Sequence, residues 1–175
     1  MLTIDIPEGE FYDSQKEIFV YTKPQRIVLE HSLVSIAKWE SKWKKSFLSS
    51  KNKTAEESID YIRCMTITQN VNDMVYMALT KELIETIFKY VESSQTATFV
   101  THADEPRPSK EPVTADVIYY WMVSLNIPFE CQKWHLSRLF SLINVCSVKN
   151  APPKKMSRYE SLKRTKDLNR QRRKG

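Results

Sequence analysis

The first 30 residues alternate short apolar runs with turn-forming residues, and this period of two is typical of β-strands. Residues 2–6 alternate apolar and polar side chains up to Pro7, and residues 10–12 and 17–21 flank a polar stretch that favours a hairpin turn. A further β-rich run, residues 26–30, follows Pro24. Together these runs predict a small antiparallel β-meander of three or four strands over residues 1–30.

From Ser32 onward the apolar positions recur every three or four residues, which predicts helices. Because Ser and Thr side chains accept hydrogen bonds from the free N–H groups of a first helical turn, we expect a helix after each of Ser32, Thr54, Thr80 and Thr114. The helix over residues 117–125 is apolar on nearly every side and should be central to the core. Residues 126–128 end it, and a second helix over residues 129–146 should complete an αα-hairpin.

The whole pattern predicts an α+β fold with one domain over residues 1–148, in which the meander precedes a mainly helical body over residues 31–148. A basic C-terminal arm, residues 149–175, follows the pair Pro152-Pro153. Ser157 is a candidate cap within the arm, but large apolar residues are few there. We therefore expect the arm to be partly disordered or a fraying helix that orders on binding.

Composition excludes several functional classes. Two glycines among 175 residues are too few for the glycine-rich loops that hold phosphates or dinucleotides. Three cysteines without a paired motif indicate reduced thiols rather than a disulfide framework. The chain shows neither a long apolar run nor a signal-peptide pattern, so we expect a cytosolic protein that does not enter a membrane.

Charge divides the chain sharply. Residues 149–175 carry eleven Lys and Arg against two acids, a net charge of +9, whereas the remaining 16 basic and 19 acidic residues leave residues 1–148 at −3. The arm admits three interpretations: docking to an acidic protein surface, non-specific contact with nucleic acid, or a solubilising tail. Sequence-specific readout is not indicated, because Tyr159 is the arm's one aromatic residue. The candidate binding residues here are Lys154, Lys155, Arg158, Lys163, Arg164, Arg170, Arg172 and Arg173.

Catalytic and metal-binding patterns are weak. Cys131 and His135 are four residues apart on the helix expected there and would share one face, but two ligands do not make a site. Paired carboxylates such as Glu56 and Glu57 fall in first turns of expected helices, where the helix dipole accounts for them. We therefore assign no catalytic, cofactor-binding or metal-binding residue and expect the protein not to be an enzyme.

Aromatic residues supply the other candidates for partner binding. Trp39 and Trp43 lie four residues apart on a lysine-rich helix, where they either form an exposed aromatic shelf or cap the core with lysines around them. Tyr120 and Trp121 are either core residues or part of an oligomer interface. Trp134 completes the set of aromatic candidates.

Several sequence blocks resemble tail assembly chaperones of long-tailed, siphovirus-like bacteriophages. The blocks are HSLVSIAKWE at residues 31–40, DYIRCMT at 60–66, IYYWM at 118–122, NIPFECQKWHL at 126–136 and KNAPPKKM at 149–156. The resemblance implies a non-enzymatic, cofactor-free protein that binds the tape measure protein and helps tail tube subunits assemble around it. It also implies a homo-oligomer in the host cell cytoplasm that is absent from the mature virion. The alternatives are a small basic nucleic-acid-associated protein and a structural tail component retained in the particle.

Overall fold

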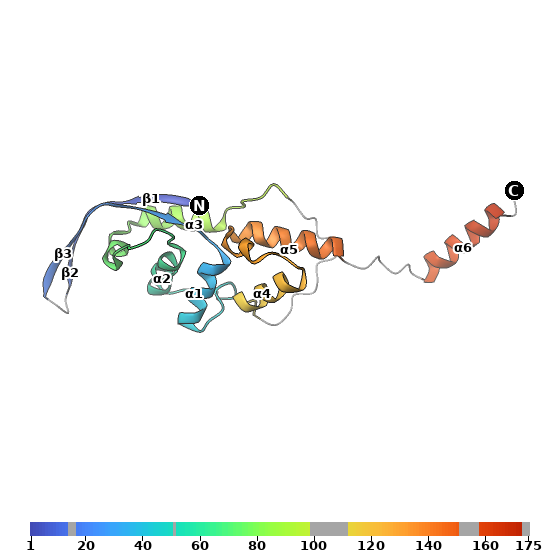
Figure 1. Ribbon diagram of the computed structural model, residues 1–175, viewed down its shortest axis with the longest axis horizontal. Helices are drawn as coiled ribbons and strands as arrows, with labels where there is room; N and C mark the ends of the chain where they lie inside the picture. The colour runs from blue at the N-terminus through green and yellow to red at the C-terminus, as the bar shows by residue number, and fades with distance from the viewer. Residues whose placement is uncertain (14–16, 51, 99–111, 151–157, 173–175) are drawn as a thin grey trace.

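The computed structural model describes residues 1–13, 17–50, 52–98, 112–150 and 158–172, and it confirms the α+β class (Figure 1). The strands are β1 (Leu2–Ile6), β2 (Gly9–Asp13), β3 (Ile18–Thr22) and β4 (Gln25–Leu29). The helices are α1 (Leu33–Trp43), α2 (Ala55–Met65), α3 (Lys81–Glu92), α4 (Ala115–Ser124), α5 (Leu136–Asn150) and α6 (Arg158–Arg172), with short 3-10 helices η1 (Asp73–Ala78) and η2 (Phe129–Lys133).

The four strands form one long hairpin rather than a meander. The first strand, β1, pairs with the last, β4, and the two middle strands, β2 and β3, pair with each other. Both pairs are antiparallel, so the inner pair continues the outer pair, whereas in a meander β1 would pair with β2. The ladder stops after Ile6↔Gln25 and resumes at Gly9↔Thr22. Pro7 and Pro24 stand in this gap, and because proline lacks a backbone N–H it interrupts strand pairing there.

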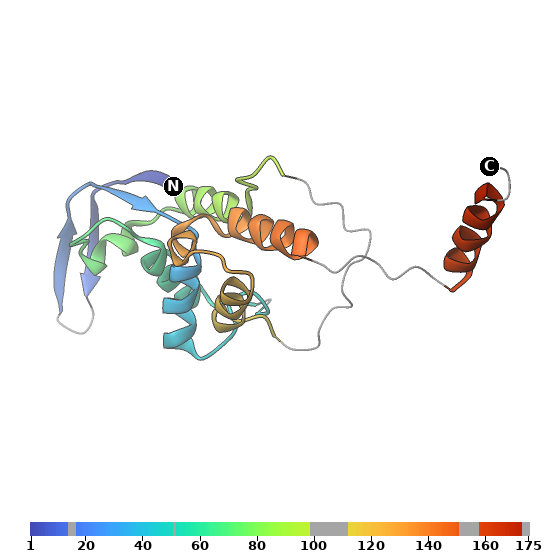
Figure 2. The same ribbon diagram turned by 45° about the vertical axis from the view of Figure 1, so that its right-hand side comes forward.

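The two halves of the long hairpin have different surroundings. Ile4, Ile6, Ile27 and Leu29 of the outer pair are buried in the core, and β1 contacts α3. The β2–β3 hairpin instead extends beyond the α-helices, as Figures 1 and 2 both show, and it contacts η1. The hairpin expected around residues 13–16 is thus confirmed, although its turn lies outside the described residues.

The predicted helix starts are confirmed at all four capping residues. The side-chain oxygens of Ser32, Thr54, Thr80 and Thr114 each accept the backbone N–H three residues ahead, at Ser35, Glu57, Leu83 and Val117. At Thr54 the Glu57 carboxylate also accepts the N–H of the capping residue, which completes a capping box. These local contacts fix where the polypeptide turns into each helix.

Helix α1, not α4, is central to the core. Leu33, Ile36 and Trp39 are each 0% exposed, and α1 contacts both α2 and α4. Its Glu40 carboxylate accepts the N–H of Ala115 at 2.8 Å and so holds the start of α4. The expectation for α4 is wrong, because this helix buries one face and leaves Tyr120 exposed on another.

The expected helix over residues 129–146 begins later than predicted. Residues 129–133 form η2, and His135 then makes an isolated antiparallel bridge with Ser32. Leu136 donates its N–H to the His31 carbonyl at 2.8 Å, so the chain is extended where the sequence pattern predicts continuous helix. Cys131 and His135 therefore do not share a helical face, and the metal-ligand spacing that their sequence positions suggested is lost.

Helix α6 lies apart from the other helices in Figures 1 and 2. All of its side chains that the structure describes, at Tyr159 and at residues 162–172, are exposed. The basic segment begins within α5, because Lys149 and Asn150 form the end of that helix. The candidate cap Ser157 lies outside the described residues.

Candidate protein-binding surfaces

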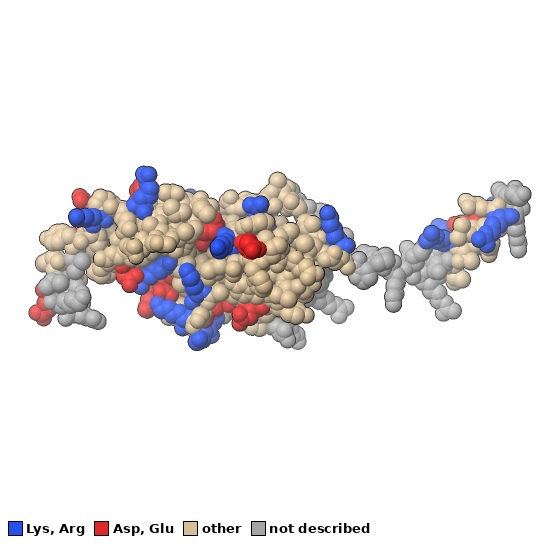
Figure 3. Space-filling model, viewed as in Figure 1, with Lys and Arg blue, Asp and Glu red and all other residues tan. Residues whose placement is uncertain are grey.

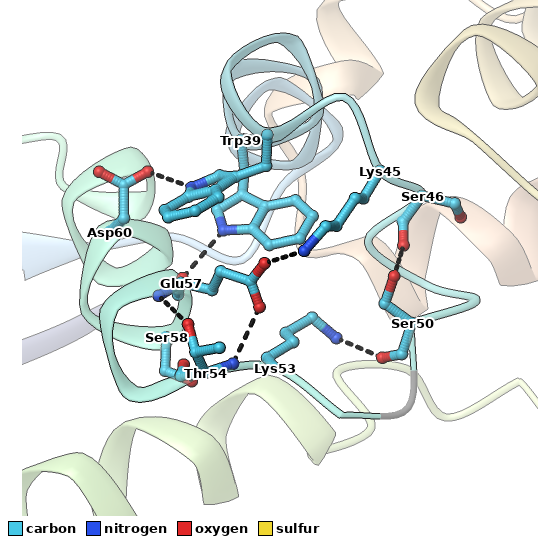
Figure 4. A network of polar contacts seen from close by, with 10 residues as sticks. Trp39, Lys45, Ser46, Ser50, Lys53, Thr54, Glu57, Ser58 and Asp60 are labelled. Atoms are coloured by element: carbon cyan, nitrogen blue, oxygen red, sulfur yellow. Dashed lines mark hydrogen bonds and ion pairs between the residues drawn. The ribbon is translucent and has the colours of Figure 1, made fainter.

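Trp39 is a core residue and not part of an exposed shelf. Its ring is 0% exposed, stacks on Trp43 with ring centroids 6.2 Å apart, and packs edge-on against Phe47. Its indole N–H donates to the Glu57 carbonyl on α2 at 2.9 Å (Figure 4). The prediction that Trp39 contacts a partner is therefore wrong, because a partner cannot reach a ring that the fold encloses.

The lysines around Trp43 are engaged within the fold. Trp43 is half-buried and donates its indole N–H to Asp60 at 2.8 Å, and Lys42 pairs with the same buried carboxylate. Lys45 pairs with buried Glu57, and its hydrogen bond, followed by the Thr54 backbone N–H, lowers the pKa of that carboxyl (Figure 4). Because these cations compensate buried acids, the Trp43 region is better suited to stabilising the α1–α2 packing than to stacking on nucleic-acid bases.

Three exposed side chains and one half-buried ring on α4 and η2 form an apolar surface. We call it the α4 aromatic surface: Tyr119, Tyr120, Val123 and Phe129. Tyr120, Val123 and Phe129 are 69%, 57% and 53% exposed, and the rings of Tyr119 and Phe129 lie 6.4 Å apart. Positions three and four apart on a helix are neighbours, so Val123 lies beside both tyrosines. A contiguous apolar surface of this kind is typical of a site that contacts another protein.

Polar groups border and orient this surface. The Tyr119 hydroxyl donates to Gln132 at 2.8 Å, which ties α4 to η2 and orients the ring. Exposed acids, Asp116 on α4 and Glu130 on η2, flank the apolar side chains in sequence. Of the two predicted α4 candidates, Tyr120 belongs to the α4 aromatic surface, whereas Trp121 is half-buried against the core.

Trp134 lies between η2 and α5 and is half-buried against the core. The guanidinium carbon of Arg138 lies 4.1 Å from the centre of its ring, an arrangement that gives a favourable cation–π contact. Trp134 therefore has a partner on its own chain, and its exposed part is smaller than that of Tyr120.

The predicted basic candidates divide by position. Lys163, Arg164, Arg170 and Arg172 are exposed on α6, and Figure 3 shows Lys and Arg side chains along this helix. Arg158 is the first residue of α6. Lys154, Lys155 and Arg173 lie outside the described residues. The structure thus places five of the eight basic candidates on α6 and shows four of them to be exposed.

The sequence reasoning missed a second aromatic surface, on the β2–β3 hairpin. Tyr12, Phe19 and Tyr21 are 55%, 61% and 72% exposed, and the rings of Tyr12 and Phe19 are 5.2 Å apart. The signal was present, because these residues occupy alternate positions on two paired strands and must share one face.

Two buried histidines join the starts of α1 and α5. His31 Nδ1 lies 2.5 Å from the Tyr61 hydroxyl, and its ring centroid is 5.1 Å from that of His135. His135 Nδ1 accepts the Ser137 N–H, which leaves Nε2–H to donate to the Tyr90 carbonyl at 3.2 Å. Burial lowers the pKa of both rings, and repulsion from His135 when that ring is protonated lowers the pKa of His31 further, so both are neutral near pH 7. Each residue is 5% exposed, so this cluster holds the fold together rather than meeting a substrate.

Among the residues that the structure describes, no three His, Cys, Asp or Glu side chains gather as a metal site would require. None of the helices in this part of the chain combines the length and apolar character needed to cross a bilayer. No protein-family model, curated protein or solved structure matches the chain.

Proposed function

We propose that this protein is a tail assembly chaperone of a long-tailed bacteriophage, which binds the tape measure protein in the host cell cytoplasm and assists tail tube assembly without catalysing a reaction. The sequence blocks that resemble this family support the proposal, and the observation that carries it is the α4 aromatic surface. A chaperone of this kind must cover apolar surface on a client, and Tyr120, Val123 and Phe129 offer such a surface on the outside of a folded body.

The α4 aromatic surface suits an amphipathic client helix. Each large apolar side chain that becomes buried contributes roughly 1.5–3 kcal/mol before the cost of association is subtracted. Tyr120 would act as the central contact, because it is the most exposed of the group and aromatic residues dominate interface energetics. Asp116 and Glu130 would favour a client whose apolar stripe is bordered by Lys or Arg.

Co-expression of tape measure fragments with variants of this chain tests the proposal. The variant Tyr120→Ser/Val123→Ser/Phe129→Ser should release most of the client into the insoluble fraction, whereas the full chain keeps it soluble. Met77→Ser is the control, because it removes an exposed apolar side chain from η1, outside the α4 aromatic surface. A triple variant that stays folded by circular dichroism and keeps as much client soluble as the natural chain would refute the role of the α4 aromatic surface.

The proposal includes absence from the mature virion. Mass spectrometry of purified particles should detect the tail tube and tape measure proteins but not this chain. Detection of the chain at a stoichiometry similar to that of other tail proteins would instead support a structural tail component.

Non-specific nucleic-acid binding is the second candidate, and the exposed cations of α6 favour it. Such binding would weaken steeply with added salt, because each neutralised phosphate releases counterions. Titrating the chain with generic duplex and single-stranded DNA at several salt concentrations distinguishes this function from client binding. If the chain binds neither duplex nor single-stranded DNA at low salt, non-specific nucleic-acid binding is refuted.

A further inference from the structure

We propose that copies of this protein associate head to tail, with the basic helix α6 of one copy docking on the outer face of the β2–β3 hairpin of the next. This association is separate from client binding, because it uses neither α4 nor η2.

The outer face of the β2–β3 hairpin is an exposed aromatic surface. The register Tyr12↔Phe19 and Glu10↔Tyr21 places all four side chains on one face of the paired strands. The opposite face lies on η1, since a Cβ added at Gly9 would come 3.2 Å from the Ala78 Cβ. A two-stranded hairpin is marginally stable by itself, so the uncovered aromatic face would gain from a partner.

The same hairpin is acidic. Residues 8–22 contain four acids and one lysine, a net charge of −3, and Glu8, Glu10 and Glu17 are exposed. A hydrogen bond from the Tyr21 hydroxyl to Glu10 raises the pKa of Tyr21, which places a carboxylate directly among the exposed rings. A partner for this face therefore needs positive charge together with groups that pack on aromatic rings.

Helix α6 meets both needs. Residues that follow a given helical position by four, seven and eleven lie on the same side of the helix as that position. Counted from Tyr159, these positions are Lys163, Lys166 and Arg170, so one side of α6 carries an aromatic ring and three cations in a row. The row is about 16 Å long at 1.5 Å per residue, close to the roughly 17 Å of a five-residue strand. Cations on this row can lie over the hairpin rings and pair with Glu8 and Glu10.

The two surfaces lie at opposite ends of the molecule in Figures 1 and 2. Helix α5, which leads toward α6, ends on the side of the body away from the β2–β3 hairpin in both views (Figures 1 and 2). A second copy can present α6 to the hairpin without this constraint. Because the two contacting surfaces differ, an assembly always has a free hairpin at one end and a free α6 at the other, so the contact can repeat from copy to copy.

Sedimentation of two complementary variants tests the contact. The hairpin variant is Tyr12→Ser/Phe19→Ser/Tyr21→Ser, and the α6 variant is Lys163→Glu/Lys166→Glu/Arg170→Glu. The natural chain should form oligomers larger than dimers as its concentration rises, and each variant alone should remain monomeric. An equimolar mixture should form dimers and nothing larger, because one joint is intact and both remaining ends are blocked. Tyr120→Ser should associate as the natural chain does.

Charge exchange keeps the test valid if the aromatic substitutions unfold the hairpin. The variant Glu8→Lys/Glu10→Lys should be monomeric alone, and with the α6 variant it should form dimers and larger alternating oligomers, because each joint between the two variants then pairs opposite charges. A natural chain that stays monomeric, an α6 variant that still assembles, or mixtures that remain monomeric would each overturn the proposal. If the natural chain is monomeric and binds duplex DNA, and the α6 variant no longer binds that DNA, the proposed association is overturned and α6 is instead a nucleic-acid contact. Client solubility measured with the α4 variant remains an independent test of the proposed function.

Discussion

Mild acid should destabilise this fold through His31, which lies where α1, α2 and α5 meet. The ring is 5% exposed and faces the Tyr61 hydroxyl, the ring of Phe47 and the ring of His135. Burial, followed by the nearby charge of His135, lowers the pKa of His31 from 6.5 to about 4. Protonating this ring would place a charge in the core without a carboxylate partner beside it.

The direction and size of the effect follow from linkage. An unfolded His31 takes up a proton near pH 6.5, whereas the folded ring stays neutral until about pH 4, so unfolding binds a proton between these values. Stability contributed by the neutral ring is therefore present at pH 7.5 and is lost as the pH falls through this window. At pH 5 the two pKa values correspond to a loss of about 2 kcal/mol. His135 acts in the same direction, because its pKa is also lowered mainly by burial.

Urea unfolding followed by tryptophan fluorescence measures this loss at about pH 7.5 and about pH 5, where carboxylates remain mostly ionised in the unfolded chain. The variant His31→Gln cannot titrate at this position, so it should lose about 2 kcal/mol less than the natural chain between the two pH values. The compared quantity is the change in unfolding free energy between the two pH values, so a destabilisation that His31→Gln causes equally at both pH values cancels. An equal loss in both proteins would refute the reasoning, as would a His31 pKa near 6.5 in an NMR titration.

Three further substitutions test the packing around α1. Trp39→Ala should cost about 3–5 kcal/mol in urea unfolding, because the ring is fully buried. Glu40→Ala should cost about 1.5–3 kcal/mol by losing the charged hydrogen bond that holds the start of α4 and a second one from the Phe47 N–H, and hydrogen exchange should quicken at the start of α4 first. Lys45→Met should destabilise the protein at neutral pH, because it leaves the buried Glu57 carboxylate without its lysine partner. The substitution also brings the Glu57 pKa closer to its usual value, so the free energy of unfolding should fall less between pH 5 and pH 3 in this variant than in the natural chain.

The starts of the helices could be predicted from the sequence because their causes are local. At Thr54, for example, both partners of the capping box lie within four residues of chain. The strand pairing could not be predicted in the same way, since the paired residues of β1 and β4 lie 19 to 27 positions apart in the sequence. The prolines that interrupt the ladder are visible in the sequence, but their alignment opposite each other depends on a register that only the folded hairpin sets.

The candidate binding residues show a different difficulty. Trp39 and Trp43 share a helix face with lysines, and the sequence does not reveal that Glu57 and Asp60 approach that face from α2. Conversely, Tyr120 lies on a helix whose composition favours the core, yet it is exposed. An apolar side chain that packs inside its own chain and one that awaits a partner have the same hydrophobic character, so periodicity alone cannot separate them.

The charge division along the chain has a spatial counterpart that bears on assembly. The acidic β2–β3 hairpin and the end of α5 that leads to the basic segment point in opposite directions (Figure 1). Two such molecules attract when the hairpin of one approaches α6 of another, and they repel when like ends meet. This preference extends over roughly 10 Å at moderate salt and would orient copies before their aromatic surfaces touch. Head-to-tail association should therefore slow as salt rises, whereas dissociation, which depends on the buried rings, should change much less.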